Sequence, residues 1–209
     1  MNNSLGSLDV IVERNIEVPM RDGTVLRSDI WRPDAAGQFP VLIERTPYDK
    51  TASSESSLGA GEYYASHGYV TVIQDVRGRF ASDGEFYPFR DDGDGENQDG
   101  YDTVEWAAAQ RWSNKRIGTI GGSYSGATQY RMLATQPPHL EAQFVRQSSS
   151  DYYIEWVYRS GAFEHGFNIS WVLKHASTNA AKLAPDGMED EVVTRLNKAS
   201  DDYQKWLEH

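Results

Sequence analysis

The fold is decided by residues 117–126, which read IGTIGGSYSG. An apolar strand pattern runs into a glycine-rich turn at Ser123, and a helical pattern follows over 125–136. A serine hydroxyl becomes an effective nucleophile when a sharp strand-to-helix turn exposes it and a neighbouring base takes its proton. Such a turn needs small residues on both sides. Gly121 and Ser125 meet this need, although Ser125 stands where the G-x-S-x-G pattern has glycine. We therefore predict that Ser123 is a nucleophile; the alternative is a glycine-rich turn without chemistry.

Short apolar strands alternate with helices through the first 150 residues. Continuous apolar strands separated by helices are typical of a parallel sheet covered on both faces. Beyond residue 150 the pattern changes to amphipathic helices with aromatic anchors, and we expect no further strand there. We therefore expect an α/β domain over 1–150 and a helical segment over 151–209. The predicted elements are two strands joined by a turn over 8–33, strands at 40–44, 69–74, 117–120 and 142–146, and helices at 56–67, 101–110, 125–136, 151–177 and 188–207.

The composition limits the classes of function. The 209 residues carry 20 lysines and arginines against 31 aspartates and glutamates, and the resulting net charge of −11 argues against nucleic-acid binding. A hydrophobic content of 39% is enough to build a core, yet no apolar run is long enough to cross a bilayer. The chain has no cysteine, so disulfides, thiolate zinc sites and a cysteine nucleophile are excluded. The N-terminus lacks a secretory signal pattern, which predicts a cytoplasmic protein without a membrane partner.

Several motifs together resemble a known family. GGSYSG looks like the G-x-S-Y-x-G nucleophile motif of the Xaa-Pro dipeptidyl-peptidase/cocaine esterase-like α/β-hydrolases (peptidase family S15, with the α-amino acid ester hydrolases). The other matching stretches are VPMRDGTVLRSDIWRP, IERTPYDK, VIQDVRGRFASDGEF and DTVEWAAAQRWSNKRIGTIGGSYSG. They cover residues 17–150 in the family's order, and residues 151–209 resemble the beginning of its helical cap. The resemblance implies an α/β-hydrolase fold, incomplete in this chain, with a mostly parallel sheet and flanking helices.

The resemblance also assigns roles to three residues of the first 150. Ser123 would form an acyl-enzyme, while the backbone N–H of Tyr124 and the hydroxyl of Tyr48 would bind the oxyanion. The substrate would be a small ester or amide or a short peptide, and no metal or organic cofactor is expected. Peptidase, esterase and acylase activities share this machinery, so the choice among them stays open, as does the oligomeric state.

Aromatic residues just after residue 150 are candidates for substrate binding. We expect most of them to pack within the cap, but their predicted place above the site also lets Tyr152, Trp156 or Phe163 line an acyl pocket. SGAFEHGF resembles a segment of the amino ester hydrolases, in which carboxylates recognise a substrate ammonium group. Glu155 is our candidate carboxylate for this role.

The acid and the base of a catalytic triad are not evident. In this fold they follow the nucleophile on loops after later strands. We expect His139, in a turn close to the elbow, to be structural, and His165 and His175, on the predicted cap helices, to be solvated or packed. His209 is the last residue and has no strand before it. We therefore expect an N-terminal fragment of a serine hydrolase that lacks the triad Asp and His. The alternatives are a non-catalytic truncated remnant and one half of a split hydrolase completed by a second chain.

The long loop after residue 76 invites two further interpretations. The acidic run 91–102 suggests a calcium loop, but the glycine required at position six is Asp99, so we expect an acidic helix N-terminus instead. Asp75 and Arg77 follow a predicted strand. We expect them to order the loop through hydrogen bonds; the alternative is that they face the substrate.

Overall fold

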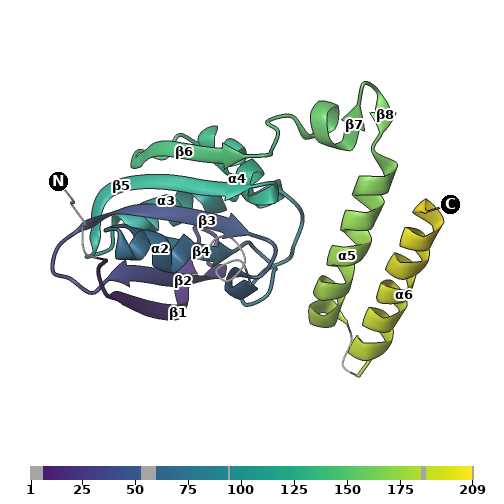
Figure 1. Ribbon diagram of the computed structural model, residues 1–209, viewed down its shortest axis with the longest axis horizontal. Helices are drawn as coiled ribbons and strands as arrows, with labels where there is room; N and C mark the ends of the chain where they lie inside the picture. Colours follow the sequence, from purple (N-terminus) through teal and green to yellow (C-terminus); the bar gives the residue numbers. More distant parts are fainter. Residues whose placement is uncertain (1–6, 53–59, 94, 185–186, 209) are drawn as a thin grey trace. The chain divides into compact units, whose positions relative to one another are not determined.

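The computed structural model describes residues 7–52, 60–93, 95–184 and 187–208 (Figure 1). The chain divides into two compact units, Met1–Ser150 and Asp151–His209. Among the described residues, no helix combines the length and the apolar character needed to cross a membrane.

A six-stranded sheet forms the centre of the first unit, with the spatial strand order β1-β2-β4-β3-β5-β6 (Figure 1). β1 pairs antiparallel with β2, and β2 with β4, whereas β4, β3, β5 and β6 run parallel. The carboxyl ends of these four parallel strands therefore meet at one edge of the sheet, where α/β proteins place their binding sites. The strands are β1 (Val10–Pro19), β2 (Val25–Pro33), β3 (Phe39–Thr46), β4 (Val70–Asp75), β5 (Ser113–Gly122) and β6 (Leu140–Arg146).

Helices cover both faces of this sheet, as the apolar strands predicted. The helices α3 (Asp99–Ala108) and α4 (Tyr124–Leu133) share one core with Val72 and its neighbours on β3 and β5. On the opposite face, α2 (Ala60–Ser66) buries Ala65 against Trp31 and Ile73. Consecutive residues of β4 thus point to opposite faces, as the pleat of a strand requires. The part of the predicted 56–67 helix before residue 60 lies outside the described residues.

The structure of the second unit corrects two predictions, a helix over 151–177 and the absence of any strand after residue 150. Residues 151–164 do not begin a long helix: a π-helical turn (Tyr153–Val157) leads into a hairpin of β7 (Tyr158–Arg159) and β8 (Ala162–Phe163). Ser160 and Gly161 form the turn with φ of 51° and 82°. A tight hairpin turn with two positive φ values favours such a Ser-Gly pair, and this local signal outweighs the helical period.

Two long helices complete the second unit. They are α5 (His165–Leu183) and α6 (Glu189–Leu207), which pack side by side (Figure 1). The predicted helix at 188–207 corresponds to α6, whereas α5 starts later and ends later than the predicted 151–177 helix.

Candidate active site

Ser123 occupies a strained turn between β5 and α4. Its backbone angles are φ 55° and ψ −122°, a conformation that non-glycine residues rarely adopt. The surrounding chain holds this conformation from both sides: the Ser123 N–H donates to the carbonyl of Arg146 on β6 at 3.0 Å, and the Ser123 carbonyl accepts from the amides of Gly126 and Ala127 at 3.0 Å. Strain that the fold maintains at one residue on the carboxyl edge of the sheet is typical of a nucleophile elbow.

The small residues around Ser123 are sterically required. A Cβ on Gly121, which has φ of 140°, would lie 2.5 Å from the Cβ of Ser125, and one on Gly126 would lie 2.6 Å from the Cβ of Ser148. The first of these distances also explains why serine is tolerated at position 125, since its Cβ takes the space that Gly121 leaves open.

Tyr48 and Tyr124 come together beside this turn. Their ring centroids are 6.4 Å apart with an edge-on arrangement. Tyr48 follows the end of β3, and Tyr124 opens α4, so its amide is in the first turn, where helix N–H groups point outward. The Tyr124 ring is buried and stacks on Phe89, and the Tyr124 hydroxyl accepts a hydrogen bond from the Phe89 N–H at 3.1 Å. The Tyr124 side chain therefore anchors the long loop.

Glu44 is a buried carboxyl group beneath the elbow that the sequence prediction missed. It is 8% exposed near the end of β3. Burial raises the pKa of Glu44, while a hydrogen bond from Ser125 and the positive charge of Arg146 act in the opposite direction. The only sequence signal is a charged residue directly after the apolar run 41–43.

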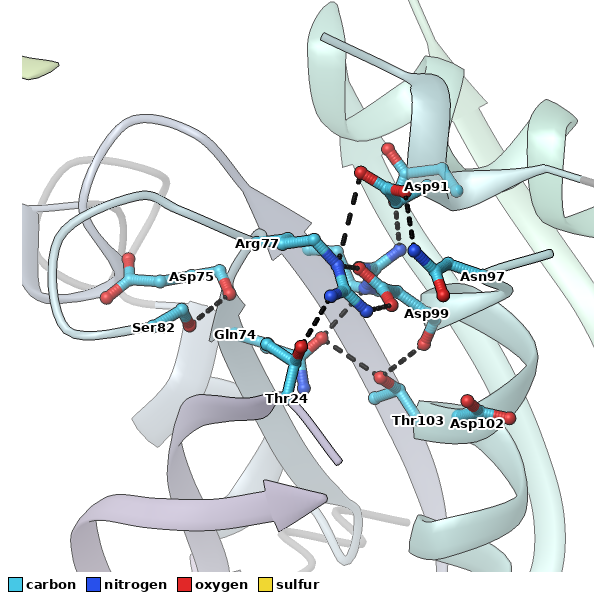
Figure 2. A network of polar contacts seen from close by, with 12 residues as sticks. Thr24, Gln74, Asp75, Arg77, Ser82, Asp91, Asn97, Asp99, Asp102 and Thr103 are labelled. Carbon is cyan, nitrogen blue, oxygen red and sulfur yellow. Dashed lines mark hydrogen bonds and ion pairs between the residues drawn. The ribbon is translucent and has the colours of Figure 1, made fainter. Parts of the chain in front are cut away.

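Arg77 is the centre of a buried network that fastens the long loop to the sheet (Figure 2). It binds Asp99 through two hydrogen bonds, from Nη2 to Oδ1 at 2.6 Å and from Nε to Oδ2 at 3.0 Å. Its Nη1 also donates to Asp22 at 2.7 Å and to Thr24 at 2.6 Å, both in and beside the β1–β2 turn. Burial acts to lower the pKa of Arg77, but the two carboxylates outweigh it and raise this pKa.

Arg45 extends the same network along β3. It forms an ion pair with Asp92 and donates from Nε to Gln74 at 2.8 Å, and Gln74 also accepts from Thr103 at 3.0 Å. The Asp75 carboxylate accepts hydrogen bonds from the amides of Lys50 and Ala81. Together with the contacts of Arg77, these bonds order the loop after β4.

The acidic run 91–102 is only partly the helix N-terminus that the sequence predicted. Asp99 and Asp102 lie in the first turn of α3, but Asp91, Asp92 and Asp99 are buried, and they serve as partners for arginines and Asn97. Sequence patterns could not show this, since the partner arginines come from distant segments. Within the described residues, no group of three or more acidic or histidine side chains is arranged to hold a metal ion.

The histidines of the described chain have structural partners. In the first unit, Nδ1 of His139 lies 2.7 Å from Glu105, and Nδ1 of His67 lies 2.7 Å from the carbonyl of Tyr63. In the second unit, His165 contacts the hydroxyl of Tyr203 at 2.7 Å.

The second unit has a pocket of about 240 Å³, lined by Glu155, Trp156, Arg159, Glu164 and Phe167. Two of the predicted substrate-binding residues, Glu155 and Trp156, therefore line one cavity. Tyr152 stacks on Trp156 with centroids 5.0 Å apart. Phe163 is not among the lining residues; its ring packs 5.5 Å from that of Tyr158.

The elbow at the carboxyl edge of a mostly parallel sheet, with helices on both faces, defines an α/β-hydrolase fold, and solved structures agree. A CocE/NonD family hydrolase from Staphylococcus aureus superposes with a TM-score of 0.72 at 30% identity, over 81% of this chain and 33% of that one. An α-amino acid ester hydrolase superposes with a TM-score of 0.68 at 28% identity, over 86% of this chain and 32% of that one.

The chain belongs to the X-Pro dipeptidyl-peptidase (S15) family, whose model matches residues 22–209. It is similar to a cocaine esterase from Rhodococcus sp. (strain MB1 Bresler), with 40% identity over 164 residues. That match covers 77% of this chain and 28% of the esterase. The chain thus spans about a third or less of the length of these relatives.

Proposed function

We propose that this chain carries the nucleophile and the oxyanion donors of a serine hydrolase that cleaves an ester or amide. The observation that carries the proposal is the strained backbone of Ser123, which its neighbours hold at the edge of the sheet. Membership of a family of esterase- and peptidase-like hydrolases supports it.

The proposed reaction is acyl transfer in two stages. Ser123 Oγ loses its proton to a base and attacks the substrate carbonyl, and the tetrahedral oxyanion accepts hydrogen bonds from the Tyr124 N–H and the Tyr48 hydroxyl. The C–O or C–N bond then breaks, the base returns the proton to the leaving alcohol or amine, and the acyl group stays on Ser123. Water hydrolyses this ester and releases the acid.

The acid and base of the triad would come from outside residues 1–209. Two observations support this: the described histidines bind other groups, and the chain covers only part of its relatives. We propose that residues 1–150 form the N-terminal part of the catalytic domain and that residues 151–209 are the beginning of a helical cap domain.

The pocket of the second unit would supply substrate binding. Glu155 and the aromatic wall at Trp156 and Phe167 suit a substrate with an ammonium group beside an apolar group, whereas Glu164 pairs with Arg159 at 3.2 Å. Tyr152 would support the wall by stacking on Trp156, and Phe163 would hold the hairpin by packing on Tyr158. Glu155→Gln should raise KM for phenylalanine methyl ester but not for methyl 3-phenylpropionate, which lacks the amino group. Equal changes for both esters would contradict this role, and Glu191→Gln on α6 is the matched control.

The catalytic proposal is tested by the hydrolysis of 4-nitrophenyl acetate by the full-length protein. Ser123→Ala should lower kcat by at least about 10⁴-fold, whereas Ser66→Ala at the last residue of α2 should leave kcat unchanged. Tyr48→Phe removes one oxyanion donor and should lower kcat about a hundredfold with little change in KM. Wild-type turnover by Ser123→Ala would overturn the proposal, and wild-type turnover by Tyr48→Phe would remove Tyr48 from it.

A further inference from the structure

Arg79 is a buried cation in the loop after β4, and the proposed reaction has not used it. Its side chain is 1% exposed. The guanidinium carbon lies 4.8 Å from the centre of the Phe80 ring and 5.0 Å from that of Phe86. Burying a guanidinium group is costly, so a fold that retains one there implies that its contacts matter.

The guanidinium reaches the segment that carries Tyr48. Arg79 Nε donates a hydrogen bond to the carbonyl of Pro47 at 2.9 Å, one residue before Tyr48. This bond fixes the peptide plane between Pro47 and Tyr48, since the proline ring already restricts φ on its other side. The Tyr48 N–H donates to Thr46 Oγ1 at 3.1 Å, and the Lys50 N–H donates to Asp75 at 2.8 Å, so the segment is held along its length.

The charge of Arg79 also lies close to both residues that would bind the oxyanion. Burial lowers the pKa of Arg79, and the nearby oxygens of Tyr124, Asp75 and Tyr48 act against this. The Phe86 ring that the guanidinium contacts lies 6.3 Å from the Tyr124 ring. Arg79 therefore lies in the same side-chain cluster as Tyr48 and Tyr124.

We propose that Arg79 is a positioning residue for Tyr48: through the Pro47 carbonyl it holds the Tyr48 hydroxyl where the substrate oxyanion forms. The inference rests on the proposed function, because it gives Arg79 a role only if Tyr48 is an oxyanion donor. It concerns an arginine that makes no proposed contact with the substrate.

A double-mutant cycle on the full-length protein tests the inference, with 4-nitrophenyl acetate as the probe. Arg79→Met should lower kcat about tenfold when Tyr48 is present, and less than about twofold when Tyr48→Phe is already in place. KM should change little, and Arg79→Lys, which keeps a charge and a donor, should lose only about threefold. Arg77→Met is the matched control: it is a buried arginine of the same loop that binds Asp22 and Asp99 instead, so its effect should be equal in both backgrounds.

The outcomes separate this inference from the proposed function. Equal losses for Arg79→Met in the two backgrounds would overturn the inference and leave the proposed function intact. Full activity of Tyr48→Phe would overturn the role of Tyr48 and the inference with it.

Hydrogen exchange adds a readout that does not depend on activity. Amides in residues 46–52 should exchange faster in Arg79→Met than in Arg77→Met, and Arg79→Lys serves if Arg79→Met does not fold. Unchanged exchange in this segment would contradict the positioning role.

Discussion

The substitution Asp99→Asn removes one charge from the buried network while it keeps the size of the side chain. Asp99 is 1% exposed and makes two hydrogen bonds to Arg77, and Arg45 Nη2 lies 3.7 Å from its Oδ2. Removal of one partner from a buried ion pair costs about 3–5 kcal/mol. Because Arg77 keeps Asp22, we expect the lower end of that range, about 3 kcal/mol. This cost would lower the thermal midpoint of a 209-residue chain by about 6–12 °C, and the midpoint of a longer full-length protein by less, because the shift per kcal/mol falls with chain length.

The assay is thermal unfolding of the full-length protein followed by near-ultraviolet circular dichroism at pH 7. Asp102→Asn is the matched control, since Asp102 lies three residues further along α3 and pairs with Arg21, which is 36% exposed. A pair of this kind contributes less than about 1 kcal/mol. An Asp99→Asn variant no less stable than Asp102→Asn would refute the view that this network fastens the loop to the sheet.

Three further predictions concern the elbow and the pH dependence of stability. Gly121→Ala would place a Cβ against Ser125, so it should lower kcat by at least about a hundredfold and the free energy of unfolding in urea by about 2–3 kcal/mol. Gly23→Ala is the control, because Gly23 has φ of 86° but no atom within 4 Å of the new Cβ. Gly23→Ala should cost only about 1 kcal/mol. Burial raises the pKa of Glu44, so ionisation of Glu44 destabilises the native state as pH rises. Glu44→Gln should therefore stabilise the protein more at pH 8 than at pH 4, and the reverse trend in urea midpoints would contradict this. Hydrogen bonds from a buried guanidinium lower the pKa of Asp22 from 3.8 to about 2; Asp22→Asn should therefore cost about 1 kcal/mol at pH 7 after solvent screening, and this cost should vanish as pH falls from about 4 to 2.

Local patterns in the sequence were enough to predict the sheet and the elbow. Apolar runs such as 70–73 define strands, and the small residues around Ser123 define the turn, because both depend on neighbours in the chain. The buried network could not be predicted in this way: Asp22, Arg77 and Asp99 are far apart in sequence and meet only after the sheet has formed.

The second unit shows how two local signals compete. The spacing of aromatic residues over 151–177 fits a helix, but the Ser160-Gly161 pair favours a tight turn, and the chain forms a hairpin there. Glu44 illustrates another limit, since a charged residue at the end of an apolar strand does not reveal whether it faces solvent or the elbow.

The most direct test of the nucleophile is to treat the full-length protein with a fluorophosphonate and locate the adduct by mass spectrometry. We predict one adduct, on Ser123, and none in the Ser123→Ala variant. Absence of labelling, or an adduct on another residue with Ser123 unmodified, would contradict the assignment of this turn as a catalytic elbow.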